Sequence, residues 1–185
     1  GQPSRGVAAG HTLNMYYNSV GWRTSMYDPS AGFTYDEYDA LGRTTYHRDA
    51  RHNVTKNAYV AFGRITSTII GTATDSITGY QNLEAGADTI SYTYGTSGLE
   101  KMRLVQASMG GCTATYTHHE YGNVVSETRT TDAGESLTTA WEYSDGKLSR
   151  AFYPDSVVIY YERDNWGHPV SIKLLRKRLW ELASF

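Results

Sequence analysis

The chain has 185 residues, which is enough for one domain with a hydrophobic core and too few for two domains of ordinary size. Its 17 Lys and Arg nearly balance 19 Asp and Glu, giving a formal net charge of −2, and its longest run of like charge is Arg176-Lys177-Arg178. A nucleic-acid partner held mainly by phosphate contacts is therefore not expected.

Composition also favours a largely β chain. The 16 Tyr and the abundant Thr are residue types that suit a pleated, half-buried surface. Cys112 is the single cysteine, which excludes a disulfide framework or a cysteine-built metal site within one chain. The sequence contains no run of 18 apolar residues, the length that would predict a membrane-spanning helix. The N-terminal residues lack the apolar core of a signal peptide.

The first segment, residues 1–14, is rich in Gly and Ala and has little periodicity. We expect it to be an extended, partly disordered lead-in. Residues 15–172 then read as short strands closed by turns. The clearest β-rich runs lie at 92–94, 113–117, 138–143 and 157–161, each followed within a few residues by Gly, Asn or Asp.

A glycine motif recurs through this region, usually four residues after an aromatic residue or a histidine. Its seven anchors are Gly21, Gly42, Gly63, Gly98, Gly122, Gly146 and Gly167. Successive anchors lie 21, 21, 35, 24, 24 and 21 residues apart, which is the signature of a repeat array. A step of 21 residues has room for two strands and two turns, so one repeat is predicted to be one β-hairpin.

The turn chemistry agrees with a hairpin. Asn18, Asp39 and Asp164 stand three residues before their glycines, where a short side chain can bond the backbone two residues on. The glycine then supplies the positive φ that closes the turn. Asp145-Gly146 is a direct two-residue hairpin signal.

The 35-residue step is the irregular part, degenerate between residues 68 and 89. It contains Gly71, Gly79 and Gly86 among Thr and Asp residues. It reads either as a repeat that has lost its motif, the interpretation we favour, or as a hairpin with a long loop.

The C-terminal segment, 173–185, has a different pattern. Ile172, Leu175, Leu179 and Leu182 recur at helical spacing, and basic residues occupy the other faces. We expect a short amphipathic helix that covers a sheet end. The alternatives are a helix that docks on a membrane surface or a partner, and a remnant of cloning or truncation.

The motif resembles the YD repeat of the RHS family, which reads roughly Tyr-Asp-x-x-Gly-Arg. Tyr38-Asp39-Ala40-Leu41-Gly42-Arg43 matches at every defined position. Four other repeats depart from this pattern. Val60 replaces the Asp in the repeat with Gly63 and Arg64, and His118 replaces the Tyr in the repeat with Gly122 and Asn123. Arg163 replaces the Tyr in the repeat with Asp164 and Gly167, and Tyr143 lies only three residues before Gly146. Tyr16, Tyr38, Tyr59 and Tyr94 are assigned to equivalent positions.

The resemblance implies an all-β array of consecutive antiparallel hairpins that forms a curved, open sheet, an arc of a hollow shell. In bacterial toxins of this family such shells enclose a C-terminal toxic domain, and related repeats occur in insecticidal toxin cocoons and in teneurins. The implied role is structural and non-enzymatic, and the implied partners are the remainder of a larger RHS protein or a toxic C-terminal domain. The implied location is secreted or on a bacterial cell surface.

Two alternatives stay open. Repeated aromatic residues could form a carbohydrate-binding or adhesive surface, with Tyr38 and Tyr94 as candidates for stacking on sugar rings, although packing between hairpins is favoured. Seven repeats are also fewer than a closed shell needs, so the chain could be an orphan repeat protein that self-associates through its sheet edges.

Catalytic and cofactor sites are not expected. His118 and His119 are strand neighbours that point to opposite faces and cannot chelate one ion. His47 and His52 flank Asp49 across a predicted turn and are interpreted as solvated. Cys112 is expected to be buried. Asn53-Val54-Thr55 matches the N-glycosylation pattern and is taken as chance.

Overall fold

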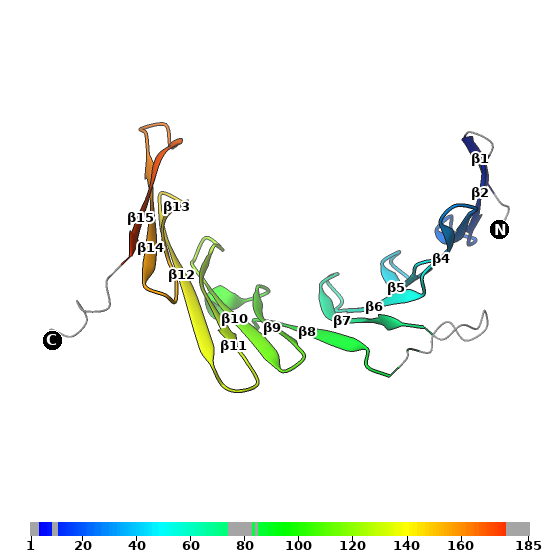
Figure 1. Cartoon of the computed structure of the whole chain (residues 1–185), viewed down its shortest axis with the longest axis horizontal. Helices are drawn as coiled ribbons and strands as arrows, with labels where there is room; N and C mark the ends of the chain where they lie inside the picture. Colours follow the sequence, from blue (N-terminus) through cyan, green and yellow to red (C-terminus); the bar gives the residue numbers. More distant parts are fainter. Residues whose placement is uncertain (1–3, 9–10, 74–82, 84, 177–185) are drawn as a thin grey trace. The chain divides into compact units, whose positions relative to one another are not determined.

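The structure, a computed structural model, describes residues 4–8, 11–73, 83 and 85–176. In these residues the chain is all β, and the order of the fifteen strands in the open sheet follows their order in the sequence (Figure 1). The chain divides into two compact units, Gly1–Ser91 and Tyr92–Phe185, called here the N-terminal and C-terminal halves. The all-β hairpin array is therefore confirmed.

In the N-terminal half, each strand pairs antiparallel with the next. The strands are β1 (Ser4–Ala8), β2 (His11–Tyr17), β3 (Arg23–Asp28), β4 (Gly32–Tyr38), β5 (Thr44–Arg48), β6 (Asn53–Tyr59), β7 (Ile65–Thr72) and β8 (Asp88–Tyr94), the last of which continues into the C-terminal half. Strand β1 pairs with β2 from Ser4 opposite Met15 to Ala8 opposite His11. These residues are extended, in a strand that pairs with β2.

In the C-terminal half, the strands from β9 onward also pair antiparallel in sequence order. A short 3₁₀ helix, η1 (Gly98–Glu100), precedes them. The strands are β9 (Leu104–Met109), β10 (Cys112–His118), β11 (Val124–Thr130), β12 (Ser136–Ser144), β13 (Lys147–Phe152), β14 (Val157–Arg163) and β15 (Pro169–Arg176).

The described residues of the irregular step between Gly63 and Gly98 form one hairpin. Strand β7 pairs directly with β8, with Ile70 opposite Asp88, and no further strand lies between them in the described sheet. A bridge between Ala73 and Leu83 extends the pairing. The direct pairing of β7 with β8 favours the alternative, a hairpin with a long loop, over a repeat that has lost its motif. Residues 74–82 and 84, in which the two interpretations differ, lie outside the described part.

The predicted C-terminal helix is wrong for residues 173–176. They belong to β15, in which Leu175 pairs with Val158 of β14. The spacing of Ile172 and Leu175 fits a helix, but pairing with β14 decides the local structure, as tertiary context often does. Residues 177–185 lie outside the described part of the chain.

Little of the described chain is fully buried. In the N-terminal half Tyr46, Val54 and Ala73 form a small cluster, each at most 3% exposed. In the C-terminal half Ala151 is the one hydrophobic residue buried to this extent among the described residues. An apolar core of this size cannot supply most of the stability, so backbone pairing and contacts between repeats must supply much of it.

Candidate functional site

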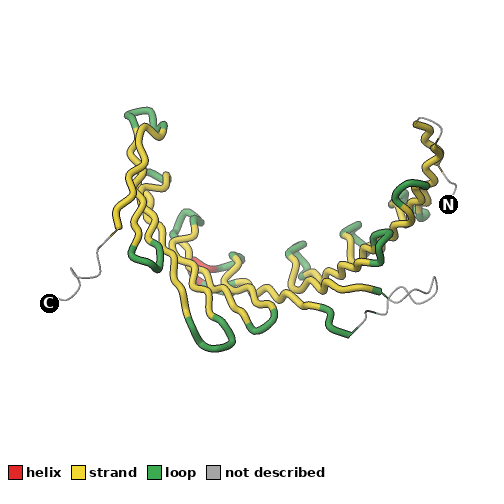
Figure 2. Tube along the Cα trace, viewed as in Figure 1, coloured by secondary structure: helices red, strands yellow, loops and turns green. Residues whose placement is uncertain are grey.

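The recurring feature of the fold is the corner formed around the motif glycines. These corners join β2 to β3, β4 to β5 and β6 to β7 in the N-terminal half, and β10 to β11, β12 to β13 and β14 to β15 in the C-terminal half (Figure 2, green). Because each corner joins an even strand to the following odd one, these motif corners lie at the same end of the strands within a half. The corners that join odd strands to even ones, the opposite corners, lie at the other end.

We name positions by their distance from the glycine. Four residues before it is the latch position, three before it the cap position, one before it the tip position, one after it the cover position and two after it the acceptor position. In the repeat around Gly42 these residues are Tyr38, Asp39, Leu41, Arg43 and Thr44.

The cap residue and the glycine close the corner together. At Gly42, which has φ +79°, the glycine N–H donates to the Asp39 carbonyl at 3.0 Å and the Asp39 N–H donates to the Arg43 carbonyl at 3.0 Å. The Asp39 carboxylate accepts from the Leu41 N–H at 2.9 Å, as the sequence predicts. Its side-chain hydrogen bond with Arg43 holds the Asp39 pKa below its ordinary 3.8.

The same arrangement recurs at two other caps. The Asn18 amide oxygen accepts from the Val20 N–H at 3.2 Å, and the Asp164 carboxylate accepts from the Trp166 N–H at 2.9 Å. Backbone hydrogen bonds, led by that from the His168 N–H, lower the Asp164 pKa. The predicted role of these cap residues is confirmed.

A β-bulge marks the latch position. The register of the sheet shifts between Glu37 and Tyr38 on β4, and between Ala58 and Tyr59 on β6. In the first repeat the shift lies between Tyr16 and Tyr17, so Tyr17 and not Tyr16 occupies the latch position. The assignment of Tyr16 is therefore wrong by one residue.

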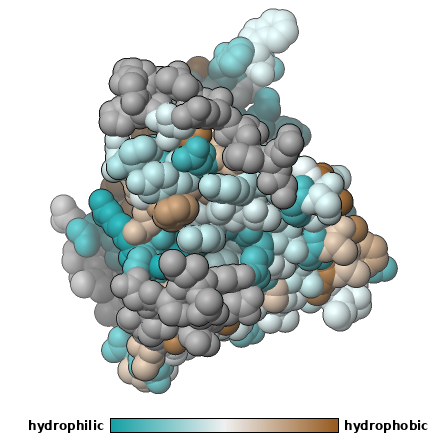
Figure 3. Space-filling model, turned by 90° about the vertical axis from the view of Figure 1, so that its right-hand side faces the viewer, coloured by the Kyte–Doolittle hydropathy of each residue, from teal (hydrophilic) through white to brown (hydrophobic). Residues whose placement is uncertain are grey.

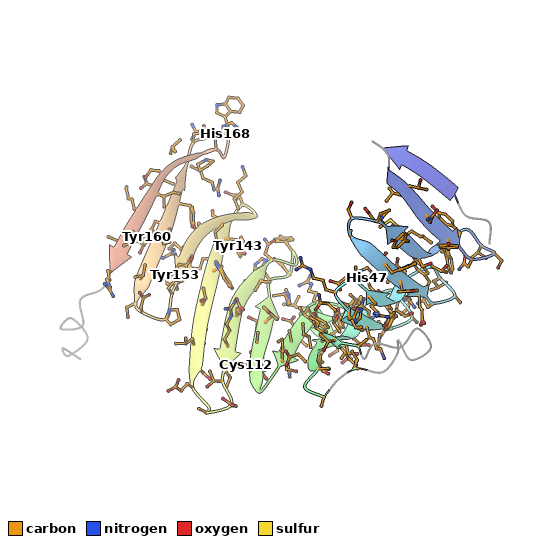
Figure 4. All side chains as sticks on the ribbon, turned by 45° about the vertical axis from the view of Figure 1, so that its right-hand side comes forward. His47, Cys112, Tyr143, Tyr153, Tyr160 and His168 are labelled. Atoms are coloured by element: carbon orange, nitrogen blue, oxygen red, sulfur yellow. The ribbon has the colours of Figure 1, made fainter. Side chains whose placement is uncertain are left out.

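The latch residue connects each repeat to the one before it. The Tyr38 hydroxyl donates to the carbonyl of Arg23 at 2.8 Å, and the Tyr59 hydroxyl donates to the carbonyl of Thr44 at 2.8 Å. In the C-terminal half Tyr143, three residues before Gly146 instead of four, makes the same contact: its hydroxyl donates to the carbonyl of Val124 at 2.9 Å (Figure 4). Each carbonyl belongs to the acceptor position of the preceding repeat.

The Tyr38 latch is protonated at neutral pH, as an ordinary tyrosine is, and its surroundings favour that form further. Desolvation, reinforced by the nearby Asp36 carboxylate, raises the pKa of the Tyr38 hydroxyl above its ordinary 10.0. A protonated phenol is the form that donates a hydrogen bond. The latch is therefore intact at neutral pH.

Two repeats replace the latch tyrosine with another donor. Arg163 donates through Nη2 to the carbonyl of Leu148 at 3.3 Å, which is again the acceptor position of the preceding repeat. His118 contacts Glu100 instead: the carboxylate accepts from the His118 N–H at 2.8 Å and pairs with its Nδ1 at 2.5 Å. Desolvation opposes ionisation of Glu100, but the hydrogen bonds from His118 prevail and lower its pKa.

The cover residue extends over the glycine of the next repeat. A Cβ on Gly42 would meet Trp22 Cζ2 at 2.9 Å. A Cβ on Gly122 would meet Nη2 of Arg103, which follows Met102 instead of a motif glycine, at 3.5 Å. Gly63 is approached by Arg43, and Gly167 by Lys147. The covering arginines also donate to the next cap residue, Arg43 to the Val60 carbonyl at 3.0 Å and Arg103 to that of His119 at 2.5 Å.

Aromatic contacts reinforce this cover. The Trp22 and Tyr38 rings have centroids 5.5 Å apart, and the Arg43 guanidinium lies 4.6 Å from the centre of the Tyr59 ring. Trp22, Arg103 and Lys147 were not singled out in the sequence. The position after each glycine is the signal that identifies Trp22 and Lys147.

The remaining predicted motif residues lie at these corners with some differences. Arg64 and Asn123 are half-buried at cover positions, and Tyr94 is half-buried at the end of β8. Gly146 closes a two-residue turn with Asp145, both at positive φ. Gly98 has φ +58° within η1, but Met102, at φ +66°, closes its corner, with the Met102 N–H on the Gly95 carbonyl at 2.8 Å.

The histidines considered in the sequence as metal ligands are not grouped into a metal site in the described residues. His47 Nδ1 pairs with Asp36 at 2.7 Å, and Arg23 pairs with the same carboxylate at 3.2 Å. His52 lies in a turn at φ +69°. Within the described residues no group of three or more His, Cys, Asp or Glu side chains could hold a metal ion.

The expectation for Cys112 is wrong. Its side chain is exposed at the start of β10, next to the corner with β9 (Figure 4). Asn53 also begins a strand, β6, and is exposed. In the part of the chain that the structure describes, no helix has the length and apolar character of a bilayer span.

No protein-family model matches the chain, and no curated protein matches it. Solved structures share its fold. A crystal structure of TcdB2-TccC3-Cdc42 superposes with a TM-score of 0.75 at 16% identity over 92% of this chain, and the Photorhabdus luminescens Tc holotoxin pore with 0.71 at 16% identity over 90%. TcdB2-TccC3 without its hypervariable C-terminal region gives 0.58 at 14% identity over 89%. This chain spans only 9%, 9% and 10% of those chains, respectively.

Proposed function

We propose that the chain is a non-enzymatic wall segment of an RHS-type β-shell that encloses or presents a toxic effector. The observation that carries the proposal is the latch between repeats. Tyr38, Tyr59 and Tyr143 each donate to the acceptor carbonyl of the preceding repeat, so these repeats are joined in sequence by side-chain contacts to the backbone. The fold shared with chains of Tc toxin complexes supports the same proposal.

The side-chain composition suits a wall better than a packed core. Thr115, Thr128 and Thr138 lie on neighbouring strands of the C-terminal half, where Thr128 and Thr138 share a hydroxyl hydrogen bond at 2.9 Å. The molecular surface drawn in Figure 3 carries mostly pale and teal side chains with scattered brown ones. A sheet with polar groups on its surface tolerates water or a cargo against it.

The proposed partners are inferred from how small a part of each similar chain this chain covers. Because the chain corresponds to about a tenth of each similar chain, the remainder of a larger RHS protein, including a toxic C-terminal domain, is the proposed partner. The proposed location is accordingly secreted or at a bacterial cell surface.

The glycan alternative gains no support at Tyr38. Its hydroxyl is engaged by Arg23 and its ring lies against Trp22, as expected for a residue that joins two repeats. Stacking of sugars on Tyr38 and Tyr94 stays an untested prediction, as does self-association through the outermost strands. We therefore propose no second function.

The proposal is tested by sequencing the reading frame that flanks this chain and by producing the complete protein that it encodes. Further repeats followed by an unrelated C-terminal domain are expected, and that domain should resist protease until the repeats are unfolded. A frame without further repeats would contradict the proposal. So would a C-terminal domain digested as fast within the full protein as when expressed alone.

A further inference from the structure

One face of the sheet in the C-terminal half carries a regular grid of Thr and Ser side chains. Residues directly opposite one another on antiparallel strands project from the same face, so the pairing register defines the grid. Thr115 lies opposite Thr128, which in turn lies opposite Thr138. The whole grid, called here the hydroxyl face, consists of Thr113, Thr115 and Thr117 of β10, Ser126, Thr128 and Thr130 of β11, and Ser136 and Thr138 of β12.

The hydroxyl groups of this face are bonded largely to one another. Hydrogen bonds between side chains join neighbouring strands from Thr117 to Ser126 at 2.6 Å, from Thr128 to Thr138 at 2.9 Å and from Thr130 to Ser136 at 2.9 Å. The Thr115 hydroxyl donates to the Thr128 carbonyl at 3.5 Å. Because these groups already have partners within the sheet, a second polypeptide gains little by replacing them.

The hydroxyl face also lacks the two kinds of side chain that hold a protein partner firmly. None of its eight members carries a charge, so the face cannot select acidic or basic groups through ion pairs. None of them is a large apolar residue, so contact with the face buries little hydrophobic surface. Thr115, Thr117, Ser136 and Thr138 are nevertheless exposed, so the face is open to contact.

The other face of the same strands has a different character. Successive residues of a strand point to opposite faces, so Glu127, Arg129 and Leu137 project away from the hydroxyl face. Arg129 pairs with Glu127 at 2.7 Å, and 73% of the Arg129 side chain is exposed. An ion pair of this kind keeps its hydration only where the surface faces bulk water. We call this side the charged face.

We propose that the hydroxyl face is turned toward the enclosed effector and the charged face toward bulk solvent. This inference rests on the proposed shell function and specifies which surface of the wall meets the effector. The partner that suits the hydroxyl face is a polypeptide that is confined without being tightly bound. A face without charges or large apolar groups accepts effectors of different composition and releases them, because it makes few strong contacts with any of them.

Two neighbouring residues of β12 allow a matched test. Leu137 and Thr138 are both exposed, but they lie on the charged face and the hydroxyl face, respectively. Leu137→Cys and Thr138→Cys are each made in a Cys112→Ser background, and variants with unchanged circular dichroism are labelled with a bulky polyethylene glycol maleimide. The complete protein is compared with the 185-residue chain, and the Cys112→Ser parent of each gives the labelling of any other cysteine.

In the 185-residue chain both cysteines are expected to be labelled, because both faces of the open sheet are accessible. In the complete protein Thr138→Cys is expected to lose its labelling, whereas Leu137→Cys should keep it. This result would support the assignment of the two faces.

The other outcomes separate a failure of this inference from a failure of the shell function. Loss of labelling at Leu137→Cys with retention at Thr138→Cys would overturn the inference and leave the shell standing, with its other face inward. Loss at both positions would also overturn it, because the charged face would then not meet bulk solvent. Labelling of both positions in the complete protein would show that neither face is enclosed, which contradicts the shell function as well.

Discussion

The hydroxyl of Tyr38 donates a hydrogen bond of 2.8 Å to the backbone carbonyl of Arg23, fifteen residues earlier and in the preceding repeat. A bulge in β4 places the ring there, and Trp22 packs against it. Because the acceptor is a backbone atom, the contact survives any change of side chain at the acceptor position. This explains how Arg23, Thr44 and Val124 can serve as equivalent acceptors.

The latch should contribute measurably to stability. Tyr38→Phe keeps the ring and removes the donor, so we expect a loss of about 0.5–1.5 kcal/mol in the free energy of unfolding. Urea denaturation followed by circular dichroism measures it. Tyr121→Phe is the control, because Tyr121 is 76% exposed, and should change stability by less than about 0.5 kcal/mol. Equal effects of the two substitutions would refute the latch.

The cover contact predicts different costs for two similar glycines. Gly21→Ala and Gly42→Ala both place a Cβ at positive φ, at a cost of about 1–2 kcal/mol. Gly42→Ala also forces its Cβ against Trp22, whereas nothing lies within 4 Å at Gly21. We therefore expect Gly42→Ala to cost about 1–3 kcal/mol more.

A double-mutant cycle isolates that contact. In a Trp22→Ala background the excess cost of Gly42→Ala should disappear, because the ring that the new methyl group meets is gone. Thermal unfolding of the four variants measures it. If Gly42→Ala still costs more stability than Gly21→Ala in the Trp22→Ala background, the contact with Trp22 is not the cause of the excess.

The Asp39 corner should give stability a distinct acid dependence. The pKa of Asp39 lies below 3.8 in the folded chain, chiefly because of Arg43. The stabilisation by the ionised carboxylate is therefore fully present above pH 3.8 and is lost as the pH falls through the folded-state pKa. Asp39→Asn should be less stable than the parent near neutral pH, with a difference that shrinks in this acid range. Melting temperatures measured across it check the prediction, and a difference independent of pH would contradict it.

Cys112 should react readily in the folded protein. Its side chain is exposed at the start of β10, so we expect Ellman's reagent to modify it in the native state at a rate similar to that in denaturant. Protection by orders of magnitude in the native state would contradict the exposed position.

The corners were predictable from sequence because turn chemistry is local. Asn18, Asp39 and Asp164 act on the backbone two residues away, within the segment that encodes them. Contacts between repeats were harder to predict. A latch tyrosine donates to a backbone carbonyl, and because every residue has one, no residue type marks the acceptor in the sequence. The latch of the first repeat is Tyr17, four residues before Gly21 and at the same register shift as Tyr38 and Tyr59, so the assignment of Tyr16 was one residue off.

Two further errors have different physical causes, one in pairing between strands and one in the conformation of a corner. Leu175 has helical spacing in the sequence, yet its partner Val158 lies in another strand and determines the outcome. Met102 at positive φ replaces a glycine where η1 lengthens the corner, and such a position has no sequence signal.

Contacts between successive repeats are tested most directly by nuclear Overhauser effects from two aromatic rings. The account predicts cross-peaks from the Tyr59 ring to the side chain of Arg43 and from the Tyr38 ring to that of Trp22, since these groups lie 4.6 Å and 5.5 Å apart. If both rings instead show cross-peaks only to residues of their own hairpin, the hairpins are not joined as described and the account fails.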